Sequence, residues 1–167
     1  MNTGQTLLTI GALILLSIII LNINRSLTES NDLLNQTRFG LEAIALASSL
    51  IEEASQLPFD EVSWDSTVLD KKWSDFTLPD DLGADLGETD FASFDDFDDF
   101  HNYAKAETTA QNIYQISCKV NYAIPIFPDF TWGFSRTYYK KLTVTIKNTF
   151  NSDSLSLSYI HGYWYYN

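Results

Sequence analysis

The sequence predicts an α+β protein in which one long N-terminal helix packs on a C-terminal antiparallel sheet of three to four strands. Two observations predict it. Residues 5–57 keep a helical pattern with no internal proline, and Pro58 then forbids the helix to continue. Three segments within residues 112–167 alternate apolar and polar side chains, a period of two that is typical of half-buried strands.

The first part of the predicted helix has the composition of a membrane segment. Residues 7–23 carry no charge and no proline, and a run of that length lies at the lower limit for spanning roughly 30 Å of hydrocarbon. We assign residues 1–26 to this apolar, transmembrane segment. A cleaved secretory signal would have a basic start and a small-residue cleavage site, which the run lacks. A plain anchor would not explain why the helical pattern continues to Leu57.

Residues 27–57 continue the helix with two apolar stripes. At about 100° per residue the stripes lie roughly 140° apart around the helix. One stripe is enough to pack on a single sheet, so the second implies a second partner. The other interpretation is a helix buried on both sides within its own domain. The first stripe comprises Leu34, Leu41, Ile44, Ser48 and Ile51, and the second comprises Phe39, Ala43, Leu46, Leu50, Ala54 and Leu57.

Residues 58–111 are predicted to connect the helix to the sheet. Trp64, Trp73 and Phe76 are expected to anchor this long connection by inserting into the core. Near its end, aromatic residues recur at every third position of residues 91–103, with aspartates between them. In a short helix or 3₁₀ turn this spacing places the rings on one side and the carboxylates on the other.

The aspartates of this acidic turn have two interpretations. The first is a solvated acidic face. In the second, Asp95, Asp96, Asp98 and Asp99, with Asp85, Glu88 and Asp90 upstream, supply oxygen ligands to Ca²⁺, which takes 6–8 of them. The glycine and the terminal glutamate of an EF-hand are missing from the segment. No other cofactor is predicted.

The alternating segments are residues 113–123, 138–150 and 154–166. Pro125 and Pro128, in the link between the first two, are expected to keep that link out of the hydrogen-bonded ladder. The aromatic residues of the link either form an interaction patch or fold back onto the sheet. These residues are Phe127, Phe130, Trp132 and Phe134.

Composition excludes several functions. The net charge of -12 opposes nucleic-acid binding, which depends on Lys and Arg. Cys118 is the single cysteine, so an intramolecular disulfide and a multi-cysteine metal site are excluded, and a buried strand position is expected for it. His101 and His161 are the two histidines, and neither lies in a catalytic motif. We therefore expect no enzyme.

Residues 4–16, with the sequence GQTLLTIGALILL, resemble the processing site of type IV pilins and pseudopilins, where a glycine precedes the helix. The helix end at residues 45–62 and the segment FDDFDDFHNY at residues 94–103 are similar to pilin-like proteins of some Gram-negative bacteria. The resemblance implies a lollipop-shaped fold and processing between Gly4 and Gln5. It also implies residence in the inner membrane before assembly, and then an extracellular filament at the cell surface.

In such a filament the N-terminal helices of many copies pack together, so the implied partners are further copies of the chain and a pilus or secretion assembly machinery. Thr9 stands where most pilins carry a glutamate, as in some minor or initiating subunits. The alternative function is a monomeric, membrane-anchored extracytoplasmic binding module. The expected assembly core consists of Leu7, Leu8, Ile10, Leu13, Ile14, Leu16, Ile18, Ile20 and Leu21.

Overall fold

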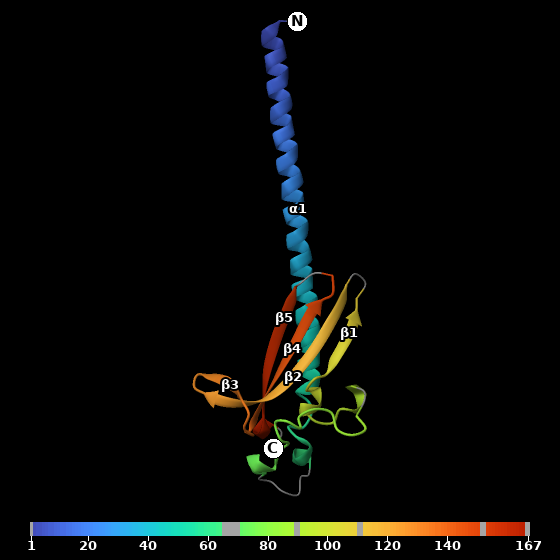
Figure 1. The fold of residues 1–167 in the computed structure, drawn as a ribbon, viewed down its shortest axis with the longest axis vertical. Helices are drawn as coiled ribbons and strands as arrows, with labels where there is room; N and C mark the ends of the chain where they lie inside the picture. Colours follow the sequence, from blue (N-terminus) through green and yellow to red (C-terminus); the bar gives the residue numbers. More distant parts are fainter. Residues whose placement is uncertain (1, 65–70, 89–90, 110–111, 151–152, 166–167) are drawn as a thin grey trace. The chain divides into compact units, whose positions relative to one another are not determined.

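The structure is a computed structural model that describes residues 2–64, 71–88, 91–109, 112–150 and 153–165. It contains one helix and one five-stranded antiparallel sheet (Figure 1). The chain divides into two compact units, residues 1–41 and residues 42–167. The elements are α1 (Thr3–Ala54), β1 (Ala104–Thr108), β2 (Ile113–Ile126), β3 (Asp129–Gly133), β4 (Tyr139–Asn148) and β5 (Ser154–Gly162), with short 3₁₀ helices between them.

The first unit consists of α1 up to Leu41. The large apolar side chains of residues 7–23 are between 48% and 75% exposed, so the isolated chain leaves this surface uncovered. Hydroxyl groups on it are satisfied by the helix itself: Thr9 donates to the carbonyl of Thr6, and Ser17 donates to the carbonyl of Leu13, each at 2.8 Å. Residues 7–23 therefore present an almost purely apolar surface, and α1 is long and apolar enough to cross a membrane.

In the second unit the strands follow the order β1-β2-β4-β5, all antiparallel, and β3 pairs with the end of β2. The register aligns Cys118 with Val144, and Leu142 with Tyr159, so apolar residues of neighbouring strands share one face. Cys118 is buried, as expected. The α+β fold class is confirmed, and β2, β4 and β5 correspond to the three alternating segments.

The two further strands lie at places where the sequence pattern is weak. β1 pairs with the outer edge of β2 and is mostly exposed, so no apolar alternation marks it. β3 forms a hairpin with residues 122–126 of β2, and Figure 1 shows it projecting to the side at one end of the sheet. The expectation that Pro125 stays out of the ladder is wrong, because Pro125 pairs with Phe130. Beyond Tyr122, β2 pairs with β3 and no longer with β4. Pro125 has no N–H group to donate, and that position faces the unpaired edge of β2.

The part of α1 that belongs to the second unit packs on the inner face of the sheet (Figure 1). Ala43, Ala47 and Ala54 are fully buried there, and such small side chains permit close approach of a helix to a sheet. The Tyr114 hydroxyl of β2 donates to the Glu42 carboxylate and links the two elements. The predicted second stripe, from Ala43 onward, is therefore the sheet-facing surface.

The helix ends at Ala54, three residues before the predicted end at Leu57. Gln56 and Leu57 donate their N–H groups to carbonyls three residues back, at 3.1 and 3.2 Å, so the last turn is tighter than an α-helix. Pro58 explains this ending, because its ring disfavours the α conformation in the residue before it.

The connection that follows the helix supplies its own core. Phe59, Phe76 and Leu82 are buried with Tyr122 and Tyr163, and the ring centroids of Phe59 and Phe76 lie 5.0 Å apart. The expectation that Phe76 is an anchor is confirmed. The expectation for Trp73 is wrong, because its side chain is 52% exposed. Phe76, three residues further on, takes the core position, and the side chain of Trp64 lies outside the described residues.

Candidate functional site

A fully buried lysine lies at the centre of the second unit. The Nζ atom of Lys140 on β4 donates to the Phe59 carbonyl at 2.7 Å, to Asp60 at 2.8 Å and to the Asp98 carboxylate. The same ammonium lies 4.6 Å from the centroid of the Phe59 ring. One side chain therefore ties the sheet to both ends of the long connection.

The protonation of this ion cluster follows from its burial. Burial by itself lowers the pKa of Lys140, but the carboxylates of Asp98 and Asp60 outweigh it, and the net pKa is raised. Burial raises the pKa of Asp98 to about 8, against the attraction of Lys140. The pKa of Asp96 is also raised, mainly by burial. The lysine is therefore charged at neutral pH. The raised pKa values of Asp96 and Asp98 mean that the aspartates around it carry less negative charge than three ionised carboxylates would.

The acidic turn is solvated only in part: Asp95 is exposed, but the other three aspartates are buried, which corrects the interpretation of a solvated face for those three. Asp96, Asp98 and Asp99 are between 3% and 4% exposed. Their carboxylates are satisfied internally. Asp96 accepts the backbone N–H groups of Asp98 and Asp99, Asp99 accepts those of Asp95 and Asp96, and Asp98 accepts the Lys140 ammonium. Hydrogen bonds and a buried cation thus replace the water that the sequence pattern suggested.

The aromatic residues of the turn also divide into two groups. Phe91, Phe94, Phe100 and Tyr103 form one ring cluster, with centroids 5.3 to 6.4 Å apart. Phe97 points elsewhere and stacks on His161 at 4.6 Å. The turn is built from two separate 3₁₀ helices rather than one, so a spacing of three does not place every ring on one side.

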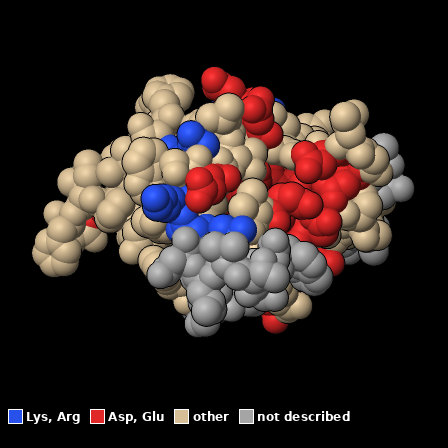
Figure 2. All heavy atoms as spheres, turned by 90° about the horizontal axis from the view of Figure 1, so that it is seen from below, with Lys and Arg blue, Asp and Glu red and all other residues tan. Residues whose placement is uncertain are grey.

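The residues predicted to bind Ca²⁺ are separated by the fold. Asp96 and Asp98 belong to the cluster around Lys140, whereas Asp95 and Asp99 lie near Glu88. Each of Glu88, Asp95 and Asp99 offers one carboxylate oxygen, and the three oxygens lie within 4.8 Å of one another. Three such oxygens are fewer than Ca²⁺ takes, so water or backbone carbonyls would have to complete the shell. Figure 2 shows Asp and Glu side chains gathered in a patch on one face of the molecule, seen from below.

The same acidic face holds carboxyl groups that resist ionisation. Burial raises the pKa of Asp99 to about 7, although hydrogen bonds from Asp96 and Asp95 oppose the shift. Burial and the neighbouring Asp95 raise the pKa of Glu61 to about 7. A cation on this face would therefore displace protons at neutral pH.

The two histidines have packing roles. The Nδ1 atom of His101 lies 2.6 Å from the Val120 carbonyl oxygen on β2. His161 is fully buried between the rings of Phe97 and Phe59, nearly parallel to both. Burial, with the nearby Lys140 charge, lowers the pKa of His161 to about 4 and keeps the ring neutral. Both imidazoles therefore fix the connection to the sheet.

The predicted assembly residues form a continuous uncovered surface on α1. Every large apolar side chain of the expected core is exposed, from 48% at Ile20 to 75% at Leu8. In the second unit, two residues of the first apolar stripe face away from the sheet: Ile44 is 45% exposed, and Ser48 is also exposed. Gly4 and Gln5, the predicted processing residues, lie in the first turn of α1, where both are exposed.

No family model, curated protein sequence or solved structure matches the chain. The resemblance to type IV pilins therefore stays a prediction from sequence.

Proposed function

We propose that the protein is a structural subunit of an extracellular, type IV pilus-like or pseudopilus-like filament. The observation that carries the proposal is the uncovered apolar surface of residues 7–23 on a helix that continues into a folded domain. Removing one such Leu or Ile from water stabilises a complex by roughly 1.5–3 kcal/mol. Packing many copies of this helix together would cover the surface without covalent links.

A membrane is the natural first environment of this helix. α1 is long and apolar enough to span a membrane, and the side chains of its apolar run are uncovered in the chain itself. In the proposed cycle the helix leaves the lipid only when neighbouring subunits replace it. Gly11, Ala12 and Ser17 would then permit close approach between helices.

Two further features support assembly over a simple anchor. A helix that served only to hold the domain at a membrane would need no apolar outer stripe beyond the lipid, yet Ile44 is 45% exposed on the second unit. Thr9 donates its hydroxyl to its own helix and carries no charge, so the helix contact would rest on apolar packing rather than on an ion pair. An uncharged residue at this position fits a minor or initiating subunit, in some of which the glutamate is also absent.

A second function, a monomeric membrane-anchored binding module, is favoured by one observation. Phe127, Trp132 and Phe134 are 98%, 62% and 78% exposed at the β2–β3 hairpin. The fourth aromatic residue of the link, Phe130, instead packs on Tyr139 of β4 with ring centroids 5.3 Å apart, so part of the link is exposed and part folds back onto the sheet.

Electron microscopy of material sheared from the cell surface separates the two functions. A filament subunit is expected in regular filaments that disappear in a Leu16→Asp variant and persist in Leu16→Ile. Finding the wild-type chain only as a monomer in detergent-extracted membranes would contradict the filament, as would normal filaments of Leu16→Asp.

A further inference from the structure

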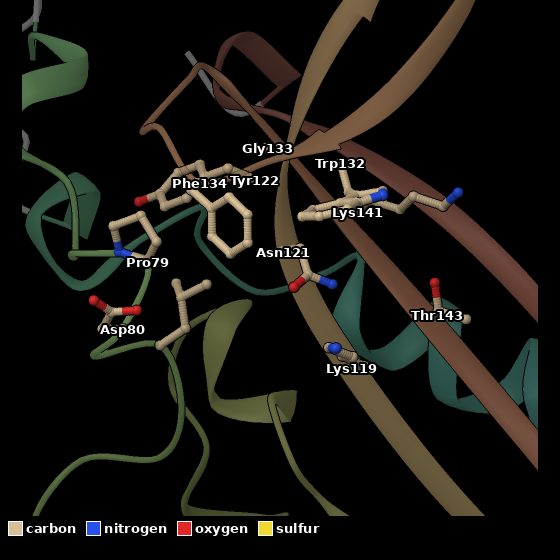
Figure 3. Close-up of a pocket in the computed structure, with 11 residues that line it drawn as sticks. Pro79, Asp80, Lys119, Asn121, Tyr122, Trp132, Gly133, Phe134, Lys141 and Thr143 are labelled. Atoms are coloured by element: carbon tan, nitrogen blue, oxygen red, sulfur yellow. The ribbon is translucent and has the colours of Figure 1, made fainter.

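A groove of about 450 Å³ lies on the outer face of the sheet, where β3 meets β2 and β4 (Figure 3). The outer face is the side that α1 does not cover. Lys119 and Asn121 come from β2, and Lys141 and Thr143 from β4. Trp132 and Phe134 form an aromatic wall from the β3 side.

The strand register places the polar residues of the groove together. Lys119 is paired with Thr143, and Asn121 is paired with Lys141, so the four side chains occupy neighbouring positions on one face. Their neighbours in sequence, such as Val120 and Leu142, are fully buried on the other face. The alternation of the two strands therefore builds a polar floor with two ammonium groups.

The aromatic wall is also positioned by the backbone. The rings of Trp132 and Phe134 meet edge to face, with centroids 5.0 Å apart. Gly133 stands between them, where an added Cβ would lie 2.4 Å from Cδ1 of Ile124 on β2. A glycine at this position lets β3 approach β2 closely and holds both rings at the groove.

The charges of the groove differ from those of the chain as a whole. The net charge is -12, yet two lysines line this groove. Within the part of the chain that the structure describes, the ion pairs involve Arg25, Lys105 and Lys140, and neither Lys119 nor Lys141 joins them. Asp80 lines the groove on the side opposite to Lys141 (Figure 3). Both ammonium groups are therefore available to an anion.

We propose that this groove binds an acidic carbohydrate, a short oligosaccharide that carries carboxylate groups. The flat face of a sugar ring, with its partly positive C–H groups, stacks on the electron-rich indole of Trp132. The sugar carboxylate pairs with Lys119, and Lys141 adds positive charge beside Trp132. Hydroxyl groups hydrogen-bond to Asn121 and Thr143 on the floor.

Other ligand classes satisfy this groove less well. A nucleic acid needs many cationic contacts along its backbone, and the acidic remainder of the chain would repel it. An apolar peptide would leave the lysines and Asn121 desolvated without partners. An acidic peptide offers carboxylates, but no flat ring for the exposed indole. Binding at this groove does not require filament assembly, since every lining residue belongs to the second unit.

The test is isothermal titration of the full chain in detergent micelles with tetragalacturonate. We expect saturable binding that weakens as salt is added, about tenfold weaker binding in Trp132→Ala, and a similar loss in Lys119→Gln. Trp164→Ala and Lys147→Gln alter an exposed Trp and an exposed Lys outside the groove and are expected to bind as the wild type does. Unchanged melting temperatures of the variants would show that the fold is intact.

Three results would overturn the proposal. The first is no binding of tetragalacturonate by the wild-type chain. The second is equal loss in the groove variants and in the two controls. The third is equal or tighter binding of an uncharged galactose oligomer, of a glutamate peptide or of single-stranded DNA. Because the titration uses micelles of unassembled chain, failure to form filaments would leave its outcome unaffected.

Discussion

Lys140 shows how one residue determines the structure of a long connection. Its ammonium satisfies Asp60 and Asp98, which lie 80 and 42 positions away in the sequence. Replacing it with methionine would leave buried carboxylates without their cation, and breaking a buried pair in this way costs about 3–5 kcal/mol. We expect Lys140→Met to lower the free energy of unfolding by that amount in urea denaturation.

The adjacent residue provides the matched control for this variant. Lys141 points to the outer face, so Lys141→Met is expected to change stability by less than about 0.5 kcal/mol. Equal effects of the two substitutions would show that the buried ion cluster does not stabilise the fold.

Asp99 gives the acidic turn a pH dependence. Its pKa is raised to about 7 in the folded chain, against an ordinary value of 3.8. The folded state therefore binds the proton more tightly, and this contribution to stability is full below pH 3.8 and is lost as pH rises towards 7. Asp99→Asn removes the titrating group but keeps an acceptor oxygen. The stability of the variant relative to wild type is expected to increase between pH 4 and pH 8. A constant difference would contradict this assignment.

Calcium binding would test the acidic group to which Asp99 belongs in another way. If Glu88, Asp95 and Asp99 hold Ca²⁺, millimolar Ca²⁺ at pH 8 would raise the melting temperature of the wild type, because ligand binding to the folded state stabilises it. The Asp99→Asn variant should show little of this shift, and Asp75→Asn, outside the cluster, should show all of it. An absence of any shift in the wild type would remove the site.

At the scale of elements, the outer stripe of α1 makes a prediction that does not involve the membrane segment. Ile44 is 45% exposed on the side away from the sheet, and assembly would bury it. Ile44→Asp would place a charge in that contact, so filaments should be lost while the chain stays folded and in the membrane. Ser49→Asp adds the same charge at an exposed position of α1 outside both apolar stripes and should be tolerated. Electron microscopy with a membrane-fraction immunoblot measures both.

The elements also show which features the sequence could predict and why other features could not be predicted from it. Helix α1 and strands β2, β4 and β5 carry strong local periodicity, so their existence follows from residue order alone. The burial of the aspartates depends on Lys140, a contact distant in sequence that no local pattern encodes. One signal was present: Lys140 has the same parity in β4 as Leu142 and Val144, so the alternation already directed it inward.

The groove on the outer face of the sheet could not be predicted from the sequence for a similar reason. Lys119 and Thr143 are adjacent only through the strand register, and Trp132 reaches them only through the β2–β3 hairpin. A sequence pattern could identify exposed aromatic residues near residues 125–137, but not the lysines beside them. Residue order thus predicts the elements, whereas the site depends on how those elements are paired.

For the whole molecule, charge and apolar surface would act in opposite directions in the proposed filament. Each copy of the chain carries a net charge of -12, so neighbouring copies would repel, while the apolar run of α1 would favour contact. Salt shortens the range of the repulsion from about 10 Å at 0.1 M to about 3 Å at 1 M, and it leaves apolar packing intact. We therefore expect the sedimentable fraction of sheared filaments to be maintained or to rise as NaCl increases from about 0.05 to 1 M. A nonionic detergent, which competes for the apolar surface, should dissolve them. Filaments that dissolve in salt would instead be held by ion pairs between subunits, and the apolar helix contact would then not be what drives assembly.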